Sequence, residues 1–247
     1  VSQYTVRKKE FLRKVPGEDI LMAVNVFTYT TSLVSLYLYS ETASNVDYDD
    51  VTPEYESFVG RRLGILGIIL EGALQTTLWG NKLCLSLFYK RINLFGFEHK
   101  IIVIILMFIG LSYMAVIIAL YDGWCRPLSD YLVLHPHNKQ CLSLTKYNIL
   151  QLSMNLSTDL VLILVPVLRV SMLKIEIGKK LMLIAFLSMG MFTMLSAILL
   201  KVHAFTTLPD KIGAVWLIWA VREVSTAMLV GNLVFCVPVL KMLWSFF

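Results

Sequence analysis

Residues Ile101 to Tyr121 read IIVIILMFIGLSYMAVIIALY and contain no charged side chain. About 20 predominantly apolar residues in an α-helix are enough to cross the roughly 30 Å hydrocarbon layer of a membrane. Backbone polar groups inside that layer need internal partners, and an α-helix provides them. We therefore predict a membrane-spanning helix from Ile101 to Tyr121.

Apolar stretches of similar length recur along the whole chain. The 247 residues are 57% hydrophobic and 16% charged, and the mean hydropathy is +0.70, which ordinary soluble domains do not reach. The sequence predicts an all-α, polytopic transmembrane helical bundle that forms a single domain over residues 1–247. The other five predicted spans are Ile20 to Tyr39, Leu63 to Tyr89, Tyr147 to Leu168, Leu181 to Leu200 and Ile212 to Leu240.

The chain begins at Val1 rather than at Met, and a basic run from Arg7 to Lys14 precedes the first predicted span. This pattern is typical of a loop that follows a helix. We therefore expect the six visible spans to be the second to seventh of a seven-helix fold. A protein with six spans is the alternative.

Charged residues predict how the chain is oriented. Basic residues gather at one set of helix ends, whereas the loop from Glu41 to Glu56 is acidic. Because Lys and Arg concentrate in cytoplasmic loops, we expect the basic loops in the cytoplasm and the acidic loop outside or in the lumen of the endoplasmic reticulum. The same bias accounts for the net charge of +5, so the expected partner is the lipid bilayer of the plasma membrane or endoplasmic reticulum, and not nucleic acid.

Two of the four cysteines, Cys125 and Cys141, fall in one loop on the predicted outer side. Disulfides form and persist in such oxidising compartments, so a disulfide within this loop is expected. A pair of unrelated thiols is the alternative. We predict no metal site.

Five ionisable residues lie inside the predicted spans. Insertion scales place the cost of one charge at a helix centre at roughly 2.5–3.5 kcal/mol, so such residues usually face a protein interior and pair with one another. We therefore expect the functional site among them. They are Glu71, Lys82, Asp159, Arg222 and Glu223.

Helical spacing places polar side chains on shared faces. At about 100° per residue, Asn148, Gln151, Asn155 and Asp159 form one stripe, and a second stripe, on the span from Leu63 to Tyr89, includes Glu71, Gln75 and Lys82. Two polar stripes predict a shared interior. Further candidates for this interior are Asn25 and Tyr29 on the first span, and Trp216, Trp219 and Glu223 on the last, with Arg222 displaced by a quarter turn or more.

Depth along the helices predicts how the charges meet. Counted from the outer ends of the spans, Glu71, Asp159 and Glu223 lie roughly 15–20 Å deep, so the three carboxylates are expected to converge. Lys82 lies deeper and is expected to reach back toward Asp159, while Arg222 is expected to pair with one of the other acids. Interhelical hydrogen bonds between Asn and Gln side chains, and a buried Lys–Asp pair, can equally serve packing alone.

Four features occur in register along nearly the whole chain. They are the run KLCLSLFYKR from Lys82 to Arg91, the loop that opens with Cys125-Arg126-Pro127 and closes at Cys141, the segment Asn155-Leu156-Ser157-Thr158-Asp159 followed by Pro166, and Glu223 with the later Cys236-Val237-Pro238. Together they resemble the fungal rhodopsin-domain family of receptor-like integral membrane proteins.

The resemblance implies a seven-helix bundle and a disulfide between Cys125 and Cys141. Members of that family are described as sensing host surfaces or small molecules, and others occur in gene clusters of secondary metabolism. The chain departs from the family pattern where Tyr131 replaces a Trp and where the loop from Glu41 to Glu56 lacks the customary Gly and His. Because Ile212 to Leu240 contains no Lys, we expect no retinal and predict no cofactor.

Two functions follow as hypotheses. The first is a receptor-like protein that binds a lipophilic small molecule in an intramembrane polar pocket and changes helix packing toward a cytoplasmic signalling partner. Its expected ligand-binding residues are Asn25, Tyr29, Gln75, Lys82, Asn148, Gln151, Asn155, Trp216, Trp219 and Arg222.

The alternative is a membrane-embedded biosynthetic enzyme, an acid/base isomerase or cyclase that acts on a terpenoid or polyketide. A buried carboxylic acid is a suitable proton donor. In this hypothesis Glu71 or Glu223 is the general acid and Asp159 its partner. Asn155 and Gln75 orient the substrate, while Trp216 and Trp219 steady a developing cation.

Overall fold

The structure, a computed structural model, describes residues 17–46, 52–91, 99–123, 125–126, 128–133, 145–172, 195, 198–199, 221–229 and 231–232. Every regular element within these ranges is helical, which confirms the all-α class. The elements are the α-helices α2 (Gly17–Ser44), α3 (Pro53–Arg91), α4 (His99–Ile118) and α6 (Thr145–Met172), the π-helical turn η1 (Ala119–Gly123) and the 3-10 helix η2 (Leu128–Leu132). Residues 221–229 and 231–232 are helical as well.

Three helices in the described part of the chain are long and apolar enough to cross a membrane. They are Ile20–Ser44, Glu54–Leu87 and Lys100–Gly123, which coincide with the first three predicted spans. The helix α6 coincides with the fourth predicted span, Tyr147 to Leu168. The fifth and sixth, Leu181 to Leu200 and Ile212 to Leu240, fall mostly outside the described residues, so the count of six spans and their numbering as second to seventh stay predictions.

The helix α3 begins ten residues before the predicted span that it contains. Pro53 occupies its first position, where a missing N–H costs no hydrogen bond. Glu54 and Glu56 lie in its first turn, where negative charge is favourable because of the helix dipole. At 39 residues the helix is roughly 58 Å long, longer than the hydrocarbon layer is thick, so part of it extends beyond that layer.

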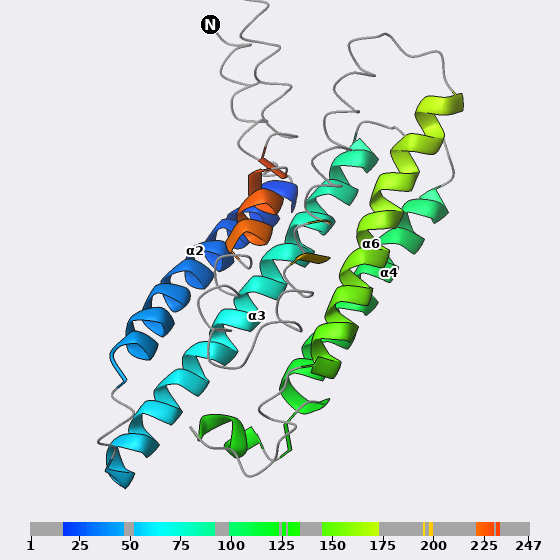
Figure 1. Cartoon of the computed structure of the whole chain (residues 1–247). Helices are drawn as coiled ribbons and strands as arrows, with labels where there is room; N and C mark the ends of the chain where they lie inside the picture. Colours follow the sequence, from blue (N-terminus) through cyan, green and yellow to red (C-terminus); the bar gives the residue numbers. More distant parts are fainter. Residues whose placement is uncertain are drawn as a thin grey trace, which may run out of the picture.

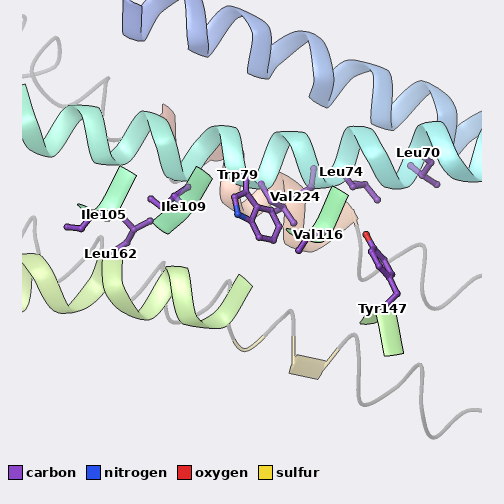
Figure 2. Close-up of a cluster of buried hydrophobic side chains, with 10 residues drawn as sticks. Leu70, Leu74, Trp79, Ile105, Ile109, Val116, Tyr147, Leu162 and Val224 are labelled. Atoms are coloured by element: carbon purple, nitrogen blue, oxygen red, sulfur yellow. The ribbon is translucent and has the colours of Figure 1, made fainter. Parts of the chain in front are cut away.

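The helix α3 lies between α2 on one side and α4 and α6 on the other (Figure 1). Its apolar residues Leu70, Leu74 and Trp79 pack against α4, α6 and the helical residues 221–229 (Figure 2). The other members of this buried cluster are Leu78, Ile105, Ile109, Val116, Tyr147, Leu162 and Val224.

The outward face of α4 is apolar and exposed. Ile104, Met107, Leu111, Met114 and Ile118 recur every three or four residues and are all more than half exposed. This spacing marks one side of a helix. An apolar stripe of this kind suits contact with lipid. Polar residues lie instead on the inward faces of α3 and α6.

Candidate functional site

The two predicted polar stripes face each other across the contact between α3 and α6. Glu71, Gln75 and Lys82 are buried on α3, and Gln151 and Asn155 are buried on α6. The shared polar interior is therefore present in the structure.

The two helices pair in a constant register. Tyr147 bonds to Glu71, Gln151 to Gln75 and Thr158 to Lys82, each across a separation of 76 residues. A constant offset means that the helices run parallel, which Figure 1 also shows. Matching polar residues along the two helices consequently lie at matching depth.

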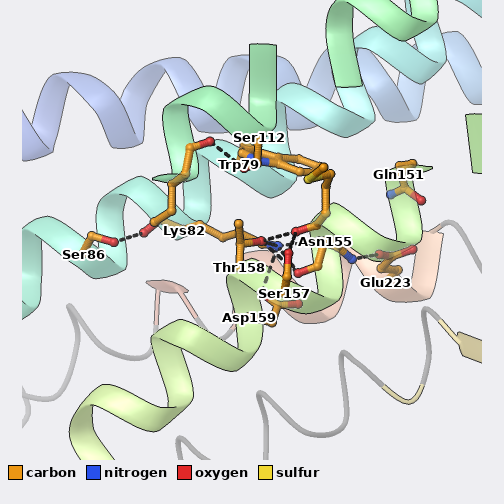
Figure 3. A network of polar contacts seen from close by, with 12 residues as sticks. Trp79, Lys82, Ser86, Ser112, Gln151, Asn155, Ser157, Thr158, Asp159 and Glu223 are labelled. Carbon is orange, nitrogen blue, oxygen red and sulfur yellow. Dashed lines mark hydrogen bonds and ion pairs between the residues drawn. The ribbon is translucent and has the colours of Figure 1, made fainter. Parts of the chain in front are cut away.

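Lys82 is the centre of the deeper half of this contact (Figure 3). Its Nζ lies 3.0 Å from Oδ1 of Asp159, as the sequence predicts. The same ammonium group donates to the backbone oxygen of Asn155 at 2.9 Å, to the Asn155 side-chain oxygen, and to Oγ1 of Thr158 at 2.7 Å. The ammonium group of Lys82 therefore has all of these hydrogen-bond and ion-pair partners on α6.

Aromatic and carboxylate side chains complete the Lys82 network. Nζ of Lys82 lies 4.8 Å from the ring centroid of Trp79, a cation–π distance, and the Trp79 Nε1–H donates to Oγ of Ser112 on α4 at 2.8 Å. Asn155 donates from Nδ2 to Oε1 of Glu223 at 2.9 Å. Asp159 and Glu223 thus belong to one network with Lys82.

Glu71 belongs to a separate network near the middle of α3. Its Oε1 accepts hydrogen bonds from Nε2 of Gln75 at 2.7 Å and from the hydroxyl of Tyr147 at 3.1 Å. Gln151 extends this network by donating from Nε2 to Oε1 of Gln75 at 3.2 Å.

The predicted convergence of three carboxylates is therefore wrong for Glu71. Lys82 follows Glu71 by roughly 16 Å along α3, and the pairing of Lys82 with Asp159 fixes the register of α6 at that depth. Tyr147, at the start of the α6 stripe, is then the residue beside Glu71. The depths predicted from the sequence were wrong because they were counted from the apolar ends of the spans, as if these ends lay at the same height in the membrane.

Tyrosine residues surround the first half of α3. A Cβ atom added at Gly67 would lie 3.2 Å from the hydroxyl of Tyr131 and 3.7 Å from Cε2 of Tyr39, and one at Gly72 would lie 2.6 Å from the hydroxyl of Tyr121. Burial raises the pKa of Tyr131, and the negative charge of Glu71 raises that pKa further. The Tyr131 hydroxyl therefore stays neutral at physiological pH.

Asn25 and Tyr29, predicted as ligand-binding residues, connect α2 to its neighbours. Asn25 donates from Nδ2 to Oδ1 of Asn81 at 2.7 Å and to the sulfur of Met228 at 3.4 Å. The hydroxyl of Tyr29 lies 3.0 Å from Oγ of Ser225. Both residues join α2 to the helical residues 221–229, and Asn25 also contacts α3.

Three buried polar atoms among the described residues lack a hydrogen-bond partner. They are Oε1 of Gln151, Oδ1 of Asn25 and Nδ2 of Asn81. An unsatisfied buried polar atom usually costs about 1–3 kcal/mol. Such atoms mark positions where a donor or acceptor from outside the chain would lower the free energy.

The sequence profile of the fungal rhodopsin domain matches residues 11–246, nearly the whole chain. The chain belongs to the fungal rhodopsin domain family. This confirms the resemblance, and with the apolar helices it identifies an integral membrane protein. No curated protein and no solved structure matches this fungal rhodopsin domain.

Other predicted site residues of this fungal rhodopsin domain are less buried or lie outside the described part. Asn148 is half-buried on α6, and Arg222 is exposed. Trp216, Trp219 and Cys141 lie outside the described residues. Cys125 is buried, and its predicted pairing with Cys141 stays a prediction.

Sequence reasoning missed several polar and aromatic residues of the site. Tyr147 lies four residues before Gln151, and Trp79 three residues before Lys82, so helical spacing places both on the stripes already identified. Thr158 precedes Asp159 directly and lies three residues after Asn155. Asn81 lacks such a signal, because its partner Asn25 comes from another helix.

Proposed function

We propose that this protein is a receptor-like integral membrane protein that binds a lipophilic small molecule between the first halves of α3 and α6. The observation that carries the proposal is a pair of acceptors on buried side chains that the described part of the chain leaves incompletely bonded. One is the carboxylate of Glu71 and the other is Oε1 of Gln151.

Glu71 is 9% exposed, yet both of its hydrogen bonds arrive at the same oxygen, Oε1. No described residue donates to Oε2. Gln151 is likewise bonded at only one of its two polar atoms. Its Nε2 donates to Gln75, while its Oε1 has no partner among the described residues. A ligand that donates hydrogen bonds would satisfy both acceptors.

The surroundings favour a ligand that is otherwise apolar. Small-molecule sites are mostly lined by apolar and aromatic side chains, with a few polar groups that orient the ligand. Leu70, Leu74 and Tyr147 lie buried near Glu71 and Gln75 in this way. A lipophilic molecule would also accumulate in the bilayer that surrounds the helices.

The Lys82 network is suited to respond to such a ligand. A ligand between Glu71 and Gln151 would shift α6 against α3, and the constant register would carry that shift to the contacts of Lys82 with Asn155, Thr158 and Asp159. This network lies deeper along both helices, toward the ends that we predict to be cytoplasmic. A signalling partner would bind there.

The test is ligand-dependent thermal stability in lipid nanodiscs, across a panel of lipophilic alcohols, amines and sterols. A ligand at 100 times its Kd stabilises the folded state by about 2.7 kcal/mol. We expect at least one compound to raise the Tm of the wild type and to lose this effect with Gln151→Met. The control Glu54→Gln, at the exposed start of α3, is expected to keep it. A panel without effect, or one that stabilises Gln151→Met equally, contradicts the proposal.

A membrane-embedded isomerase or cyclase of fungal secondary metabolism is the second candidate. It is favoured by the bonding of Glu71 to the neutral side chains of Gln75 and Tyr147, since a carboxyl group without a bound cation can donate a proton. Asp159 suits this role less, because Lys82 holds its charge.

Product analysis tests the enzyme hypothesis. Cells that express the protein are fed terpenoid and polyketide precursors, with wild type, Glu71→Gln and Glu223→Gln compared at equal expression. Acid catalysis predicts that conversion by the wild type falls strongly in one of the two variants. Conversion that survives both substitutions contradicts it.

A further inference from the structure

We infer that the site around Glu71 binds an organic ammonium cation, held by the Glu71 carboxylate and by the tyrosine side chains beside it. The inference rests on the proposed small-molecule function and names its ligand class.

The first step concerns charge. Ion pairs between described residues join Lys82 with Asp159 and Arg126 with Asp122, and none of them includes Glu71. Both donors to Glu71 are neutral. A buried carboxylate without a countercharge is costly, so a cationic ligand is the natural complement of this position.

The second step concerns the aromatic neighbours. The hydroxyl of Tyr147 lies 3.1 Å from Oε1 of Glu71. Tyr131, from η2, approaches α3 at Gly67, one helical turn before Glu71, and Tyr121, from η1, approaches at Gly72, the next residue. Three separate elements thus bring a tyrosine side chain to the stretch of α3 from Gly67 to Gly72, which includes Glu71.

The glycines are the reason that these approaches are possible. A methyl group at Gly72 would lie 2.6 Å from the Tyr121 hydroxyl, and one at Gly64 would lie 2.7 Å from the backbone oxygen of Tyr131. A larger residue at Gly64 would push the backbone of η2 away from α3, and one at Gly72 would displace the Tyr121 hydroxyl. The glycines therefore allow the tyrosine side chains to approach this part of α3.

The third step concerns the kind of cation. The tyrosine side chains approach α3 with their hydroxyl oxygens, and a hydroxyl oxygen can accept a hydrogen bond from an ammonium group. A divalent metal ion instead requires several anionic oxygens, and the described residues contain no group of three or more His, Cys, Asp or Glu placed to bind one. One carboxylate among tyrosines consequently fits an alkylammonium, whose apolar tail would extend among the buried leucines or into lipid.

The test compares two probes that share an alkyl chain and differ in charge. Radiolabelled dodecylammonium and dodecanol are titrated into the protein in phosphatidylcholine nanodiscs, and empty nanodiscs give the partition into lipid. We expect saturable binding of the ammonium probe that Glu71→Gln weakens about tenfold or more, which corresponds to 1.4 kcal/mol. Glu54→Gln is expected to leave it unchanged.

A second variant removes an aromatic ring without touching a charge. Tyr131→Leu is expected to weaken the ammonium probe several-fold, with thermal unfolding confirming that each variant folds. Binding of the ammonium probe that survives both Glu71→Gln and Tyr131→Leu overturns the inference, as does the absence of saturable binding. Saturable dodecanol binding without ammonium binding overturns the inference alone and leaves the proposed small-molecule function standing. The proposed function itself fails if the panel in the thermal assay has no effect, or if it stabilises Gln151→Met as much as the wild type.

Discussion

Lys82 shows how a single residue sets the geometry of this site. Its ammonium group has an ion pair with Asp159 and hydrogen bonds to Asn155 and Thr158, and Trp79 covers it with an aromatic ring. Both charged side chains are largely buried. In such an environment the pair matters less for its own attraction than for the penalty that follows when one partner is removed.

The variant Lys82→Met tests this penalty. Methionine has a similar shape but leaves Asp159 without its countercharge, which typically costs about 3–5 kcal/mol for a buried pair. Thermal or denaturant unfolding in a neutral detergent measures the loss. We expect the double variant Lys82→Met/Asp159→Leu to recover most of it, since no unpaired charge is then left. Equal stability of Lys82→Met and wild type would show that the pair contributes nothing.

At the scale of helices, a small residue decides how closely α2 approaches α3. A Cβ atom at Gly80 would overlap Oδ1 of Asn25, and one at Gly231 would lie 2.9 Å from Oδ1 of Asn81. These glycines flank the hydrogen bond between Asn25 and Asn81. Close approach through small residues is a common way for membrane helices to pack.

Gly80→Ala is expected to destabilise the protein by about 1–3 kcal/mol, the usual cost of an oversized residue at a packed position. The matched control is Gly110→Ala in α4, where an added Cβ meets nothing within 4 Å. Because alanine favours helix over glycine by about 1 kcal/mol, the control is expected to be neutral or stabilising. The two Tm values measured in the same detergent compare them. A loss in Gly110→Ala as large as that in Gly80→Ala would contradict the packing explanation.

The helix faces were predictable from the sequence, but the helix neighbours only in part. The spacings of four and seven in Glu71, Gln75 and Lys82 recur in Tyr147, Gln151 and Thr158, and this shared pattern is the register that α3 and α6 adopt. Helical periodicity carries such information. It carries none about the partners of Asn25 and Tyr29, which come from α3 and from residues 221–229, because pairing between distant segments depends on packing of the whole bundle.

For the whole molecule, the charges of the loops predict which helix ends face the cytoplasm. Ser44, exposed at the end of α2, belongs to the acidic loop, and Lys100, exposed at the start of α4, belongs to a basic one. Positive charge favours the cytoplasmic side. The two positions are therefore expected on opposite sides of the membrane.

Cysteine labelling in intact cells tests this orientation. With a thiol reagent that does not cross membranes, Ser44→Cys is expected to react, if the protein resides in the plasma membrane. Lys100→Cys is expected to react only after permeabilisation, and wild type gives the background from its own cysteines. In a protein retained in the endoplasmic reticulum, selective permeabilisation of the plasma membrane is expected to expose Lys100→Cys first. The reverse pattern would invert the predicted topology.

Glu71 and Gln151 are proposed to form a site for a ligand and not merely a packed contact. An experimental density map of the protein in lipid nanodiscs, saturated with the compound that stabilises it most, tests this directly. We expect non-protein density within hydrogen-bond distance of Oε2 of Glu71 and Oε1 of Gln151, which this density would bridge. A map in which protein side chains satisfy both oxygens, with the compound bound elsewhere, would contradict it.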